Sequence, residues 1–234
     1  LFRSQLITAT TAIGVTAMPF VTCFVSPPSI GIGASQQLGE LCVESCEVMN
    51  TGVSPDNTTI SALSWGVIAD LILEARVQSN LITYANAALL DANQEHRALW
   101  MRGWLEQAIT LGSGQLVFGF SAQILDNKFL GPGRTALVEV AQQNVSDNLF
   151  RRFERLFFSN NFCWHASVAA QGTATVSLSA RSAIVMGNHI KTNVPIPSVD
   201  FHGMKDAVYM GNLAQANPVN FGGIPSPISG FNRP

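Results

Sequence analysis

The sequence predicts an α+β protein that is predominantly α-helical, with long antiparallel helices, a small β element and extended N- and C-terminal arms. Two observations behind this prediction are patterns of hydrophobicity. Apolar residues recur every four positions along 56–79 and 134–159, which indicates helices, whereas residues 173–181 alternate between apolar and polar side chains, which indicates a strand. The third observation is that both ends of the chain are apolar and almost free of charge.

Residues 1–39 form the predicted N-terminal arm. No Asp, Glu, Lys or Arg occurs between Arg3 and Glu40, and the apolar stretch 6–25 has the length of a membrane-spanning helix. Five threonines, a glycine and a proline dilute that stretch, so burial against a partner subunit is favoured over a membrane segment or a retained signal peptide. The expected membrane or partner contacts are Leu6, Ile7, Ile13, Val15, Phe20, Val21 and Phe24.

Residues 40–187 are predicted to form a helical core domain. Leu63, Val67 and Leu71 would share one face of a helix over 56–79. Ser54-Pro55-Asp56 reads as an N-cap with proline at the first helical position. Further helices are predicted over residues 40–50, 81–111 and 134–159, with a loop at 126–133.

The β element is expected where the spacing of apolar residues changes from four to two. Its apolar face would consist of Ala174, Val176, Leu178 and Ala180, and residues 182–186 would extend the strand or pair with it. No internal repeat is recognised along the chain.

Residues 188–234 form the predicted C-terminal arm. Six of the eleven prolines lie beyond His189, and residues 207–232 carry no charge. Large apolar side chains such as Phe201, Tyr209 and Phe221 are nevertheless spread through this segment. Disordered tails are poor in such residues, so we expect an extended arm that lies on a protein surface.

The low content of charged residues limits the classes of partner that the chain is expected to bind. Charged residues make up 12% of the sequence, against about 25% in a typical soluble domain. The net charge of −2 gives no reason to expect nucleic-acid binding. Ten arginines against three lysines suit contacts at protein interfaces, because the guanidinium makes planar contacts with several donors. We therefore expect self-association or other subunits of a complex as partners, with a membrane as an alternative.

Cys23, Cys42, Cys46 and Cys163 leave two interpretations open. An even number of cysteines and two glycosylation sequons fit disulfides in an oxidising compartment, whereas buried free thiols are the alternative. A zinc site built from three of these cysteines and His165 would need an atypical ligand spacing, so no metal is predicted.

The sequence contains no recognised catalytic or cofactor motif. Glu95-His96 and Asp200-x-His202 are its only close acid–imidazole neighbours. We predict no enzyme activity, no cofactor and no small-molecule ligand.

The sequence-based hypothesis is therefore a non-enzymatic structural or assembly subunit of a large oligomeric complex. It would be a virion component or part of an envelope-associated machine, located outside the cytoplasm or at a membrane, and it would use its apolar arms for contacts. The alternatives are a secreted or periplasmic enzyme with a site built from scattered residues, and a membrane-inserting protein.

Overall fold

The chain is described by a computed structural model that covers residues 11–16, 21–25, 30–35, 40–49, 63–72, 74–83, 95–103, 109–110, 116–117, 121–131, 136–141, 143–144, 150–166, 174–193, 195–214, 219–222, 224 and 227–230. Every regular element in these ranges is a β-strand, and none is a helix. The predicted predominantly helical fold is therefore wrong. The strand expected near 173–186 is confirmed as β19 (Val176–Met186).

Most strands belong to three ladders, which we name A, B and C. Ladder C runs in the order β2 (Val21–Val25), β1 (Thr11–Thr16), β3 (Ile30–Ser35), β6 (Leu63–Ile72), β9 (Glu95–Gly103), β14 (Val138–Ala141), the first half of β19 and β21 (Val199–His202). Ladder A contains β4 (Glu40–Glu44), β7 (Glu74–Gln78), β12 (Ser121–Leu125), β17 (Phe153–Ser159), the second half of β19, β22 (Asp206–Met210) and β24 (Ile228–Gly230).

Ladder B contains β5 (Glu47–Met49), β8 (Leu81–Thr83), β13 (Lys128–Gly131), β18 (Phe162–His165), β20 (His189–Thr192) and β23 (Leu213–Ala214). Two short antiparallel pairs lie outside the ladders: β10 (Ile109–Thr110) with β11 (Leu116–Val117), and β15 (Gln143–Asn144) with β16 (Phe150–Arg151). Within the three ladders, the strands pair in parallel except for β1 with β2.

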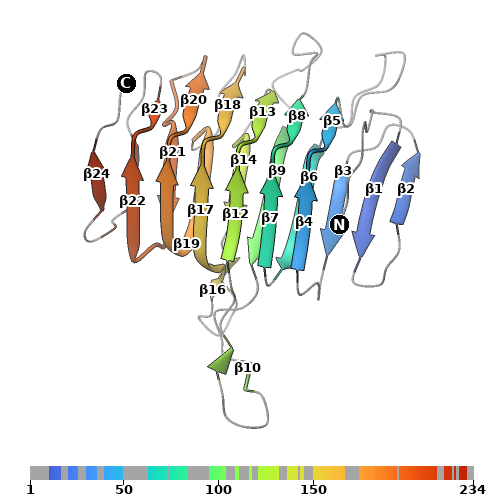
Figure 1. The fold of residues 1–234 in the computed structure, drawn as a ribbon, viewed down its shortest axis with the longest axis horizontal. Helices are drawn as coiled ribbons and strands as arrows, with labels where there is room; N and C mark the ends of the chain where they lie inside the picture. Colours follow the sequence, from blue (N-terminus) through green and yellow to red (C-terminus); the bar gives the residue numbers. More distant parts are fainter. Residues whose placement is uncertain are drawn as a thin grey trace.

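The chain visits ladders C, A and B in turn and then begins the next coil (Figure 1). From β3 onward, ladder strands that follow one another along the chain therefore lie in different ladders, and strands one coil apart are neighbours within a ladder. This winding is a parallel β-solenoid, in which each coil packs on the coil before and after it. The long strand β19 passes from ladder C into ladder A without interruption.

Most of the strands bury alternate residues, whereas the first five residues of β19 and the first three of β21 are all buried, and the inward side chains form one core. Ladder A contributes Val77, Ile124 and Phe158, and the same core cluster includes residues of ladders B and C such as Phe129 and Leu178. A strand that buries every second residue satisfies a spacing of four as well as a spacing of two. The four-residue spacing on which the helix predictions rested therefore does not distinguish a helix from a strand. In β6, Val67 and Ala69 are both fully buried.

The described parts of both predicted arms contribute strands to the ladders. β1, β2 and β3 extend ladder C at its N-terminal end, and β20 to β24 continue all three ladders. Among the predicted contact residues, Ile13 and Val15 lie in β1 and Val21 and Phe24 lie in β2. Leu6, Ile7 and Phe20 fall outside the described residues. The described part of the chain contains no helix long and apolar enough to span a membrane.

A repeated turn joins ladders A and B in each coil. Its first residue has a positive φ, as at Ser79 (56°), Asp126 (57°) and Gly187 (66°). This left-handed conformation favours glycine, asparagine and aspartate, which explains Asp126, Asn160, Gly187 and Gly211 at this position but not Ser45 and Ser79. In five coils the next residue is a buried asparagine: Asn80, Asn127, Asn161, Asn188 and Asn212. Cys46 occupies the equivalent position in the first described coil.

The five asparagines form a hydrogen-bonded ladder along the solenoid. Asn127 donates from its backbone N and its Nδ2 to Asn161 Oδ1 at 3.0 Å each, and its Nδ2 also donates to the Val77 carbonyl at 2.9 Å. The same pattern repeats from Asn161 to Asn188 and from Asn188 to Asn212. Buried amides are stable only when hydrogen-bonded, so this ladder fixes the register of the coils.

Candidate functional site

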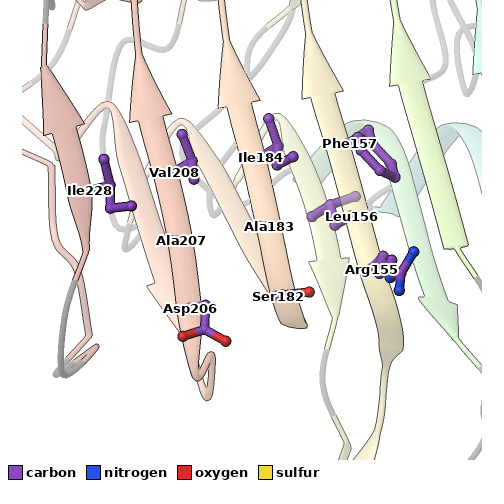
Figure 2. Close-up of a pocket in the computed structure, with 10 residues that line it drawn as sticks. All are labelled: Arg155, Leu156, Phe157, Ser182, Ala183, Ile184, Asp206, Ala207, Val208 and Ile228. Atoms are coloured by element: carbon purple, nitrogen blue, oxygen red, sulfur yellow. The ribbon is translucent and has the colours of Figure 1, made fainter.

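A shallow groove crosses the outward face of ladder A in its C-terminal coils (Figure 2). It has a volume of about 330 Å³ and spans β17, β19, β22 and β24. Because strand residues alternate, every second side chain of these strands points outward. The groove is lined by Arg155, Leu156, Phe157, Ser182, Ala183, Ile184, Asp206, Ala207, Val208 and Ile228.

Four side chains form an apolar row along the middle of this groove: Phe157, Ile184, Val208 and Ile228. Strand register places each of them beside the next, and Figure 2 shows them side by side across the four strands. Ile228 is 62% exposed, and Met186, one outward position further along β19, is 44% exposed. Contiguous exposed apolar side chains of this kind mark interaction sites more often than scattered ones do.

The apolar row is confined to the C-terminal coils. In the N-terminal coils the same row continues as Gln123, Arg76 and Cys42. Arg76 Nε lies 2.8 Å from Glu44 Oε1, and Arg76 Nη2 lies 3.6 Å from Cys42 Sγ. One end of the face is therefore polar, and the other end is the candidate contact surface.

Arg155, Ser182 and Asp206 form a second row along one side of the groove, which we call the rim. Register pairs Arg155 with Ser182 and Ser182 with Asp206, so the two charged residues flank the serine. Both are exposed, and neither forms an ion pair with any other residue in the described ranges. The groove thus offers an apolar floor and one row with opposite charges at its ends.

A separate polar site lies on ladder C, where His202 Nε2 is 2.9 Å from Asp200 Oδ2. The Asp200 side chain is 4% exposed and that of His202 is 46% exposed. Burial raises the pKa of Asp200 above its usual range, although the His202 charge and a hydrogen bond from the Asn220 side chain oppose that shift. An imidazole held against a buried carboxyl is an arrangement that proton-transfer sites use.

The row that contains Asp200 continues across ladder C as Ser177, Glu139 and Trp100. Glu139 is engaged in an ion pair at 2.8 Å with Arg97, and the Arg102 guanidinium lies 5.6 Å from the Trp100 ring centroid. This row could hold a polar ligand, but its two acidic residues already have partners: Glu139 pairs with Arg97, and Asp200 pairs with His202.

The structure places the predicted cysteines apart from one another. Cys42 lies on β4, Cys46 follows the turn and Cys163 is buried on β18, and all three are free thiols. The side chain of Cys23 is outside the described part. Burial raises the pKa of the Cys163 thiol. His165 is fully buried at the end of β18.

Among the residues described, no group of three or more His, Cys, Asp or Glu side chains is arranged to hold a metal ion. The side chains of Glu95 and His96 lie outside the described part, whereas Asp200 and His202, also noted in the sequence, do come together.

Sequence reasoning missed the apolar row and the asparagine ladder. Two signals point to the ladder: each buried asparagine follows a residue suited to positive φ, and each precedes a short strand of ladder B. The distance along the chain from one ladder asparagine to the next varies from 47 to 24 residues, and this irregular spacing conceals the repeat. No family model, curated protein or solved structure matches this chain.

Proposed function

We propose that this chain is a non-enzymatic structural subunit of a large oligomeric assembly, such as a virion or an envelope-associated machine outside the cytoplasm. It would make its subunit contacts through the outward face of ladder A. The observation that carries this proposal is the apolar row of Phe157, Ile184, Val208 and Ile228, a continuous outward-facing stripe across four strands in which the first three side chains are half-buried and Ile228 is exposed.

Two further features support a structural role. The asparagine ladder and the continuous core make the solenoid a rigid rod in which each coil is bonded to the next. The charged fraction of 12% is also low for a freely soluble surface. β2 lies at the N-terminal end of ladder C, and such an end strand is a second place where another chain could pair.

Sedimentation of the purified chain in detergent-free buffer tests the proposal. We expect the wild-type chain to self-associate, so that its average molecular mass increases with concentration. Ile184→Glu should reduce them to monomers, because it places a charge in the centre of the apolar row, and its circular dichroism spectrum should stay unchanged. Leu130→Glu makes the same kind of change at a half-buried, outward position of ladder B, away from this face, and is the matched control. A wild-type chain that is a monodisperse monomer at every concentration would contradict the proposal.

A second candidate function is that of a secreted or periplasmic enzyme, and the contact between His202 and the buried Asp200 favours it. In that case an activity found for the wild-type chain should disappear in His202→Ala and in Asp200→Asn while both variants remain folded. Retention of that activity in both variants would remove this candidate.

A further inference from the structure

The groove on ladder A has an internal symmetry centred on β19. On the rim, Arg155 lies one strand to one side of Ser182 and Asp206 lies one strand to the other side. Neighbouring strands are about 4.8 Å apart, so the backbones of the two charged residues are separated by about 10 Å. The two side chains form no ion pair with each other in this structure, and the described residues offer neither of them another ion partner.

The apolar residues follow the same symmetry. Ile184 lies between Phe157 and Val208 in the apolar row. In the next outward row, Met186 lies between Ser159 and Met210. The central strand β19 therefore presents an apolar side chain in both rows, Ile184 and Met186. In each row, the residues of β17 and β22 lie at equal distances on either side of β19.

We propose that this face binds a second copy of the chain, related to the first by a two-fold axis that runs along β19. The rotation reverses the order of the coils but keeps the position along each strand. It places Arg155 opposite the partner's Asp206 and Asp206 opposite the partner's Arg155, while Ile184 meets the partner's Ile184. This inference rests on the proposed function and names its partner and geometry.

The symmetry argument favours a second copy over an unrelated protein. An isologous interface requires that a surface be complementary to itself, so charges of opposite sign must lie at equal distances from the axis. The rim meets this requirement. Two stacked sheets pack at about 10 Å with nearly aligned strands, which suits this flat face.

The size of the face sets the expected affinity. Five strands from β12 to β24 span about 19 Å between their axes, and three outward rows span about 14 Å along the strands. With side chains included, each copy would bury about 450 Å², or about 900 Å² in total, which is near the lower limit for specific interfaces. We therefore expect a dimer with a dissociation constant in the micromolar range.

Charge exchange on the rim tests this geometry by sedimentation equilibrium. Arg155→Glu and Asp206→Arg should each weaken dimerisation at least tenfold, because each replaces two attractive contacts by two repulsive ones. An equal mixture of the two variants should recover dimers, and so should the double variant. Lys128→Glu changes the charge as much as Arg155→Glu but lies at an exposed position of ladder B, so it should leave the dimer unchanged.

Cysteine cross-linking tests the position of the axis. In a Cys23→Ser/Cys42→Ser background, Ile184→Cys should form disulfide-linked dimers under mild oxidation, since the two copies of this residue meet at the axis. Gln123→Cys should not, because the two copies of that residue would lie about 19 Å or more apart.

The outcomes separate the two proposals. If Ile184→Glu abolishes assembly but the charge exchange does not recover it and residue 184 does not cross-link, the two-fold dimer is wrong and the proposed function stands with another contact geometry. If assemblies persist in Ile184→Glu, or if the wild-type chain is always monomeric, both proposals fail.

Discussion

The asparagine ladder makes a quantitative prediction about Asn161, its central member. Asn161→Ala removes four hydrogen bonds: those from Nδ2 to the Ile124 carbonyl and to Asn188 Oδ1, and those that Oδ1 accepts from the backbone N and the Nδ2 of Asn127. Each bond contributes about 1 kcal/mol net, and buried partners left unpaired cost more, so opening this coil should become easier by about 4 kcal/mol.

The thiol of Cys163 reports that opening directly. It is fully buried two residues after Asn161, so a thiol reagent reaches it only when the coil opens. A change of about 4 kcal/mol should increase its labelling rate about 1000-fold. Asn212→Ala removes three such bonds at the end of the ladder and should have a smaller effect.

Asn193→Ala, at an exposed position, is the control and should change the labelling rate of Cys163 less than twofold. An increase of less than tenfold for a folded Asn161→Ala variant would refute the reasoning that the ladder holds the coils together.

Three further outcomes are expected. Because burial raises the pKa of Asp200, its contribution to the free energy of unfolding is fully present below its unfolded pKa of about 3.9 and is lost as pH rises through the higher folded value. Asp200→Asn should therefore gain stability relative to the wild type between pH 4 and pH 7 in urea titrations, and a constant difference would contradict this. Cys42 should react with a thiol reagent in the native protein much faster than Cys163, whose thiol is buried and has a raised pKa; equal rates measured by mass spectrometry would count against the structure. Gly187→Ala should lower the free energy of unfolding by about 1–2 kcal/mol, because its φ is +66° and a Cβ would lie 2.5 Å from Asn160 Oδ1; an unchanged urea midpoint would argue against this turn.

Only part of this fold could be predicted from the sequence. Residues 173–181 alternate between polar and apolar side chains, so a strand was correctly expected there, and β19 also includes residues 182–186, which were expected to extend it or pair with it. The strands of ladder B contain only two to four residues, which is too short for alternation to be recognised. The spacing of four in Leu63, Val67 and Leu71 suited a helix and a strand equally, and the helical interpretation was wrong for β6.

The two candidate sites differ in how far the sequence alone predicts them. Asp200 and His202 are two residues apart on one strand, so their side chains share a face, and their contact follows from sequence spacing once the strand is known. Phe157, Ile184 and Val208 come from three coils that are 27 and 24 residues apart. Only the register of parallel strands brings them together, and no local pattern reveals that register.

The stepwise bonding of coil to coil also determines how this molecule would respond to mechanical force. Force applied at the C-terminal end of the described ladders would detach the last described coil first, because within the described residues that coil pairs only with the coil before it. The C-terminal turns are 24 and 27 residues apart, so each rupture would release about 80–90 Å of extended chain. Such a rod would lengthen in discrete increments under tension and absorb work at each one.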